Sequence, residues 1–85
     1  MPIVWSDEAW ADYLWWQSQD RKILRRINAL IKDALRGDNA GIGKPERLKG
    51  NLSGNWSRRI TEEHRLVYYL ESDRLHIVSC RYHYE

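Results

Sequence analysis

The sequence predicts an α+β protein in which two N-terminal helices pack on one face of a mainly antiparallel sheet of four or five strands. Two observations indicate this class: helical periodicity is confined to residues 6–36, and strand-like segments fill the chain from residue 46 onward. The expected order is β-α-α-β-β-β, with helices early and strands late. A chain of 85 residues without repeat or linker predicts one domain, residues 1–85.

The first two elements are a short strand and a helix. Residues 3–5 are apolar, and Ser6 is a suitable cap for a helix that runs to about Gln17. Apolar side chains at helical spacing are expected to face the sheet; they are Trp10, Tyr13 and Leu14, with Gln17 beside them. Trp15 lies on the side of Asp12, so it is expected either to be exposed for a partner or to be partly buried against the second helix.

The second helix is predicted from Arg21 to Arg36. Asp20 is its expected cap, and Gly37 stands where a left-handed residue ends a helix. A broad apolar stripe marks the core side; its members are Ile23, Leu24, Ile27, Leu30, Ile31, Ala34 and Leu35.

The strands follow in the second half of the chain. They are predicted at residues 46–49, 56–60, 65–70 and 75–82. Glycine and asparagine separate the first two, and Ser72, Asp73 and Arg74 form the turn between the last two.

Composition excludes several classes of protein. Cys80 is the only cysteine, so no intrachain disulfide is possible, and a buried core role in a reducing cytosol is expected. Neither a signal peptide nor a membrane span is predicted, which indicates a cytoplasmic protein. The His and Cys residues lack metal-ligand spacing, and the loop ending in Lys44 and Pro45 fails the phosphate-loop pattern, so no metal or cofactor is expected.

The positive charge is concentrated in one segment. The chain carries a net charge of +2, and residues 44–65 hold six basic against three acidic residues. The six are Lys44, Arg47, Lys49, Arg58, Arg59 and Arg65. Such a segment attracts phosphates, although it is also compatible with a simple solvated surface.

A second concentration of functional groups lies near the end of the chain, at residues 81–84. Metal-independent RNA cleavage needs a base for the 2′-hydroxyl, an acid for the leaving 5′-oxygen and cations for the phosphorane. Glu46 is a candidate base, His83 a candidate acid and Arg65 a planar donor for phosphate oxygens, while Tyr84 can stack on a base.

The hairpin between the last two strands has two possible registers. A two-residue loop at Ser72-Asp73 places Arg65 opposite Cys80, with His83 on the other face. A three-residue loop places Arg65 opposite Arg81, with His83 on the same face. Two facing arginines repel unless an anion lies between them, so the second register would create a phosphate site.

Simpler interpretations remain for each of these residues. Glu46 can be a surface charge and His83 a frayed terminal residue. His64 and His76 are expected to be structural. At the level of the whole protein, the alternatives to a nuclease are an RNA- or ribosome-binding module without catalysis and a structural protein whose aromatics contact protein partners.

Several of these segments also resemble a known family. The chain resembles the YoeB toxins of bacterial toxin–antitoxin operons, within the RelE-like superfamily of ribosome-dependent mRNA endonucleases, nearly from end to end. The most specific matches are Trp56-Ser57-Arg58-Arg59-Ile60-Thr61-Glu62-Glu63-His64-Arg65-Leu66-Val67-Tyr68, Gly43-Lys44-Pro45-Glu46 and Cys80-Arg81-Tyr82-His83-Tyr84.

The resemblance implies a microbial-ribonuclease-like fold and cleavage of mRNA in the A site of the 70S ribosome. It implies Glu46 as general base, His83 as general acid, Arg65 as transition-state stabiliser and Tyr84 as the residue that orients the substrate. It also implies that Lys49 and Arg59 hold phosphates, and Lys44 and Arg81 are expected to assist them.

The resemblance extends to partners. It implies a cognate YefM-like antitoxin that covers or disturbs the site, and a homodimer to which Trp15 or Trp16 contributes. One departure is that Glu85 follows the second tyrosine, where the family pattern ends. An added carboxylate near His83 is expected to raise its pKa and to repel phosphate.

Overall fold

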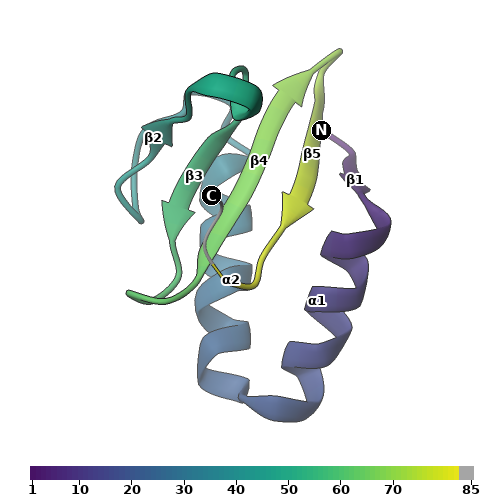
Figure 1. Ribbon diagram of the computed structural model, residues 1–85. Helices are drawn as coiled ribbons and strands as arrows, with labels where there is room; N and C mark the ends of the chain where they lie inside the picture. Colours follow the sequence, from purple (N-terminus) through teal and green to yellow (C-terminus); the bar gives the residue numbers. More distant parts are fainter. Residues whose placement is uncertain (83–85) are drawn as a thin grey trace.

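The computed structural model describes residues 1–82 and confirms the predicted α+β class. A five-stranded sheet has the order β1-β5-β4-β3-β2, in which β1 runs parallel to β5 and all other neighbours are antiparallel. Figure 1 views the sheet with α2 behind it and α1 beside it. The strands are β1 (Ile3–Trp5), β2 (Glu46–Arg47), β3 (Trp56–Arg59), β4 (Arg65–Glu71) and β5 (Arg74–Ser79).

The helices begin where the sequence predicts. Helix α1 (Asp7–Gln19) starts after Ser6, whose side chain accepts a hydrogen bond from the backbone N–H of Ala9. Helix α2 (Arg21–Ala34) starts after Asp20, whose carboxylate accepts from Lys22 and Ile23. A short 3-10 helix, η1 (Gly50–Leu52), lies between β2 and β3.

Helix α2 ends two residues earlier than predicted. Its last backbone bonds tighten to the i−3 pattern, from Arg36 to Asp33 and from Gly37 to Ala34. Gly37 then takes the expected left-handed conformation, with φ of +80°.

The predicted core face of α1 is correct for Tyr13, which packs partly buried against the core, and wrong for Trp10 and Leu14. Trp10 and Leu14 are each 46% exposed, whereas Ala9 and Trp16 are buried. The large ring of Trp16 can be buried because its one polar atom is satisfied: the indole N–H donates to the carbonyl oxygen of Cys80 at 2.8 Å. Cys80 is fully buried, as expected.

The principal core lies between the helices and one face of the sheet. Its sheet side chains include Leu66 and Tyr68 of β4 and Leu75 and Ile77 of β5. Because side chains alternate along a strand, the intervening residues face the opposite side, which we call the open face. Within residues 1–82, neither helix is long and apolar enough to cross a lipid bilayer.

The β4–β5 hairpin combines features of both predicted registers. Its loop has two residues, Ser72 and Asp73, with φ of +53° and +62°, and Glu71 pairs with Arg74. A bulge then shifts the register by one residue, so that Tyr68 pairs with Ile77 and the next residue, Val67, pairs with Ser79. The predicted strand to Tyr82 is too long, since β5 ends at Ser79 and Tyr82 has a φ of +62°.

Candidate active site

Three of the predicted site residues share the open face. Glu46 of β2 pairs with Ser57 of β3, and two residues further along β3, Arg59 pairs with Arg65 of β4. Residues two apart in a strand point to the same side, so the side chains of Glu46, Arg59 and Arg65 leave the sheet on one face.

The two arginines are directly opposite each other. Cross-strand partners have Cβ atoms about 4.5–5.5 Å apart, and like charges at that spacing destabilise the pair. Arg59 is exposed and Arg65 is half-buried. An anion between the guanidinium groups would remove the repulsion, so this pair is a candidate anion site. One of the two predicted hairpin registers placed Arg81 opposite Arg65. In the structure, the arginine opposite Arg65 is Arg59 of β3.

The loop before β4, residues 61–64, holds the guanidinium of Arg65. Nη1 of Arg65 donates to the carbonyl oxygens of Thr61, Glu62 and His64, the last two at 2.9 and 3.1 Å. The Thr61 hydroxyl accepts from the N–H groups of Glu63 and His64, which fixes the loop itself. These three carbonyls restrict the rotamer of Arg65 before any substrate binds.

The segment that carries Glu46 is tied to the strand that carries Arg59. The backbone N–H of Arg59 donates to the carbonyl oxygen of Gly43 at 2.7 Å, three residues before Glu46. Gly43 has a φ of +84°, and a Cβ there would lie 2.6 Å from Leu30, so only glycine fits. Lys44 follows in an exposed position, and Lys49, also exposed, stands directly before η1 without a side-chain capping bond.

Arg58 does not belong to the phosphate-binding set that the charge count suggested. It is fully buried and forms an ion pair with Asp33 of α2. Its other donors reach Tyr68 Oη and the carbonyl oxygens of Ala40 and Ile42, each at 3.0 Å. The hydrogen bond from Arg58 holds the pKa of Asp33 below its usual value.

Arg81 contacts aromatic rings. Its guanidinium carbon lies 3.5 Å from the ring centre of Trp15, and Nη2 donates to Tyr82 Oη at 3.1 Å. Trp15 is thus half-buried beneath Arg81. Two further predicted site residues, His83 and Tyr84, lie outside the described residues, as does Glu85.

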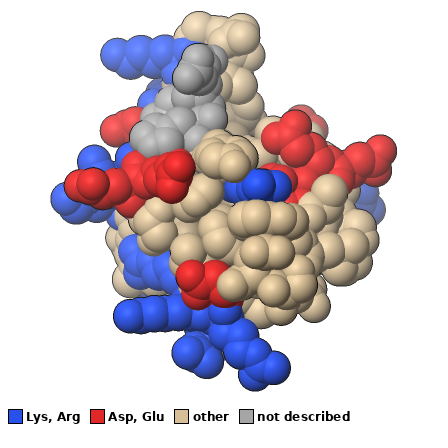
Figure 2. All heavy atoms as spheres, turned by 60° about the horizontal axis from the view of Figure 1, so that its bottom comes forward, with Lys and Arg blue, Asp and Glu red and all other residues tan. Residues whose placement is uncertain are grey.

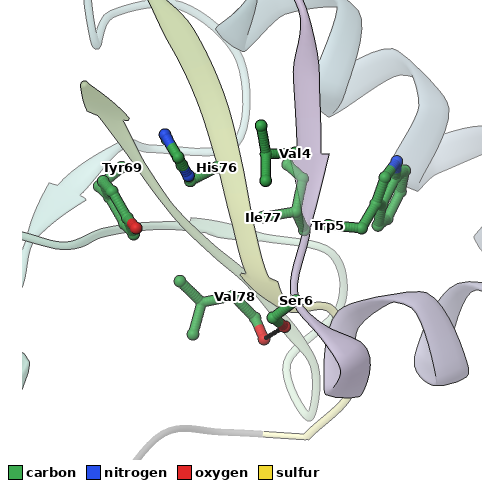
Figure 3. Close-up of a pocket in the computed structure, with 7 residues that line it drawn as sticks. All are labelled: Val4, Trp5, Ser6, Tyr69, His76, Ile77 and Val78. Carbon is green, nitrogen blue, oxygen red and sulfur yellow. Dashed lines mark hydrogen bonds between the residues drawn. The ribbon is translucent and has the colours of Figure 1, made fainter. Parts of the chain in front are cut away.

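A shallow pocket lies on the open face at some distance along β4 from Arg65 (Figure 3). Tyr69 and His76 stack face to face at its edge, with ring centres 4.5 Å apart. Ser6 closes one end, because its hydroxyl donates to the carbonyl oxygen of Val78 at 2.8 Å. His76 is therefore packed as a structural residue.

Charge is mixed on the face turned forward in Figure 2. Lys and Arg lie along the lower edge, at the upper left and in the centre, and acidic side chains lie to the left, to the right and near the bottom.

Two other chemistries find little support in residues 1–82. No three His, Cys, Asp or Glu side chains gather in this part of the chain so that they could hold a metal ion. Burial raises the pKa of the Cys80 thiol to about 12, so this cysteine is a poor nucleophile near neutral pH.

Known structures place the fold in a class of small bacterial toxins. The YoeB/ParE toxin from Agrobacterium tumefaciens superposes with a TM-score of 0.95 at 49% identity, covering 99% of this chain and 100% of that chain. A YoeB–YefM complex from Staphylococcus aureus contains a chain that superposes with a TM-score of 0.91 at 46% identity, with 99% and 98% covered.

The amino-acid sequence is similar to the same class of toxins along nearly its whole length. Residues 5–84 match the family described as YoeB-like toxin of bacterial type II toxin–antitoxin system. Toxin YoeB of Escherichia coli strain K12 is 61% identical over 84 residues, which cover 99% of this chain and 100% of that relative. The chain belongs to the YoeB-like toxins, and the predicted resemblance is confirmed.

Proposed function

We propose that this toxin is a ribosome-dependent endoribonuclease that cleaves mRNA in the A site by metal-independent acid–base catalysis and thereby inhibits translation. Membership of the YoeB-like family supports the proposal, and one structural observation carries it. Arg59 and Arg65 face each other across β3 and β4, on the same face as Glu46. This pair fits a phosphate between two cations, with a carboxylate nearby on the sheet.

The proposed reaction follows from these groups. Glu46 takes the proton of the 2′-hydroxyl, and the 2′-oxygen attacks the adjacent phosphorus. Arg65 and Arg59 donate to the non-bridging oxygens as charge develops on the phosphorane. His83 gives its proton to the 5′-oxygen as the P–O5′ bond breaks, leaving a 2′,3′-cyclic phosphate and a 5′-hydroxyl. Tyr84 orients the substrate, and Lys44, Lys49 and Arg81 assist in holding the RNA.

The proposed partners are the 70S ribosome with its A-site mRNA, a YefM-like antitoxin and a second copy of the chain. A relative from Staphylococcus aureus has been solved with YefM, and another structure of that toxin is a dimer. In this chain, Trp16 is buried in the core, so it is not available for a dimer contact. The exposed Trp10 and Leu14 of α1 are the better candidates.

Ribosomes programmed with a defined mRNA, followed by mapping of the new RNA ends, test the function. We expect Arg65→Ala to lower the cleavage rate by about two to three orders of magnitude, as loss of a transition-state donor does. Glu46→Gln and His83→Ala are each expected to cost about 10²–10⁴-fold. Arg74→Ala is the matched control, because it removes the same charge from the exposed hairpin end and should leave the rate unchanged.

The alternative is a ribosome-binding module without catalysis. Wild-type protein that binds programmed ribosomes but produces no new RNA ends would favour that alternative. If wild type cleaves and Arg65→Ala cleaves equally well, the catalytic site lies elsewhere.

A further inference from the structure

We propose that His64 is a positioning residue for cleavage: its ring fixes the backbone of Tyr82 beside Arg65, and its carbonyl oxygen helps to orient the Arg65 guanidinium. The inference rests on the proposed function and deepens it, because it assigns a role to a residue that does not itself act on the RNA.

The imidazole of His64 makes a directed hydrogen bond to the C-terminal chain. Its Nδ1 accepts from the backbone N–H of Tyr82 at 2.7 Å, and the residue is only 8% exposed. A ring nitrogen that accepts carries no proton, so the neutral ring bears its hydrogen on Nε2. Nε2 lies 3.6 Å from a carboxylate oxygen of Glu63, which favours the same tautomer.

The ring packs against two aromatic neighbours, one from α1 and one from the segment after β5. Trp16 of α1 meets it edge to face, with ring centres 4.8 Å apart at 88°, and the Tyr82 ring lies 5.2 Å away. Trp16 is itself anchored by its hydrogen bond to Cys80. The orientation of the Nδ1 acceptor is therefore determined by packing.

The backbone of His64 also contacts Arg65. Its carbonyl oxygen is one of the three that accept from Nη1 of Arg65, and it also accepts from the N–H of Ile60 at 3.0 Å. The N–H of Arg65 in turn donates to the carbonyl oxygen of Tyr82 at 3.1 Å. One residue thus orients the Arg65 guanidinium through its carbonyl and the Tyr82 backbone through its ring.

The conformation of Tyr82 explains why such a hold is needed. Its φ of +62° lies in the left-handed region, which residues other than glycine rarely adopt unless their surroundings hold them there. Hydrogen bonds at both its N–H and its carbonyl supply that constraint. Because the carbonyl oxygen of Tyr82 accepts from the N–H of Arg65, an error in the Tyr82 backbone displaces Arg65, and small displacements of catalytic groups cost large factors in rate.

Two substitutions at His64 separate positioning from packing. His64→Leu keeps an apolar side chain against Trp16 but lacks the acceptor, and His64→Asn places an amide oxygen near the position of Nδ1. We expect His64→Leu to lower kcat for ribosome-dependent cleavage by about tenfold or more with KM within about twofold, and His64→Asn to recover most of the rate. His76→Leu is the control, since it removes a histidine that stacks on Tyr69.

A second readout does not depend on activity. Amide hydrogen exchange at Tyr82 should be faster in His64→Leu than in wild type, and slow again in His64→Asn. If His64→Leu does not fold, His64→Gln takes its place, because its amide lies nearer the position of Nε2 than of Nδ1.

Different results would overturn the positioning role, the hold on Tyr82 or the proposed function. Wild-type kcat in His64→Leu, or equal losses in the Leu and Asn variants, would overturn the positioning role. Unchanged exchange at Tyr82 in His64→Leu would show that the hydrogen bond does not hold the chain. If wild-type protein does not cleave mRNA at all, the proposed function fails, and the catalytic role of His64 fails with it. The exchange measurement then still decides whether His64 holds Tyr82.

Discussion

Arg58 and Arg59 are neighbours in the chain, yet they lie on opposite faces of β3. Arg58 is fully buried among Asp33, Tyr68 and two carbonyl oxygens, and it joins β3 to α2 and to the loop before Glu46. Arg59 is exposed on the open face, opposite Arg65. The alternation of side chains along a strand therefore places Arg58 in the core and Arg59 at the proposed anion site.

The same substitution at the two positions should separate these roles. Arg58→Met removes the buried cation that pairs with Asp33 and the donors to two carbonyl oxygens, so we expect it to cost about 3–5 kcal/mol of unfolding free energy, measured by urea denaturation. Arg59→Met should change that free energy by less than about 0.5 kcal/mol but weaken RNA cleavage. Equal stability of the two variants would contradict the assignment.

At the scale of elements, α1 covers the end of β5 with the face that carries Ala9 and Trp16. The thiol of Cys80 lies 3.8 Å from the carbonyl oxygen of Ala9, and its backbone N–H donates to Asp12 at 3.0 Å. The helix thereby shields the point at which the chain leaves the sheet toward the proposed site.

Thiol labelling measures this cover. Because burial raises the pKa of Cys80 to about 12, we expect iodoacetamide at pH 8 to leave the folded protein almost unmodified. The unfolded protein in urea should react at the rate of a free cysteine. Rapid labelling without denaturant would show that α1 opens readily or does not pack on β5 as described.

The whole molecule carries an apolar patch that its own core does not use. Trp10 and Leu14 of α1 are each 46% exposed, and Trp10 adjoins the rings of Trp5 and Tyr13 with centres 5.7 and 6.1 Å away. Contiguous exposed apolar surface of this kind is typical of protein interfaces. It supports the proposed homodimer more directly than Trp15, whose ring is covered by Arg81.

Sedimentation or light scattering tests this surface. A charge in a desolvated apolar contact is costly, so Trp10→Lys should shift a concentration-dependent dimer toward monomer. Ile42→Lys is the matched control, because Ile42 is 43% exposed but lies in the loop after α2. A dimer that is unaffected by Trp10→Lys, or equally affected by Ile42→Lys, would place the interface elsewhere.

Much of the fold could be predicted from local patterns. Ser6 and Asp20 marked the helix starts, because a side-chain cap depends only on residues nearby in the chain. The apolar stripe of α2 was confirmed at Ile27, Leu30, Ile31 and Ala34. The core face of α1 was predicted correctly only at Tyr13, since aromatic residues lie on several sides of that helix and periodicity does not say which side meets the sheet.

For the candidate site, the residues are a property of the sequence and their arrangement a property of the fold. The sequence by itself determined the fold class, the family and the concentration of cations in residues 44–65. Only the tertiary structure decided that Arg59 faces Arg65, that Arg58 is removed from solvent, and that His64 joins the 61–64 loop to Tyr82. The physical reason is that these contacts depend on strand register and on a bulge at Val67/Tyr68, and a one-residue shift in register moves every side chain to the other face.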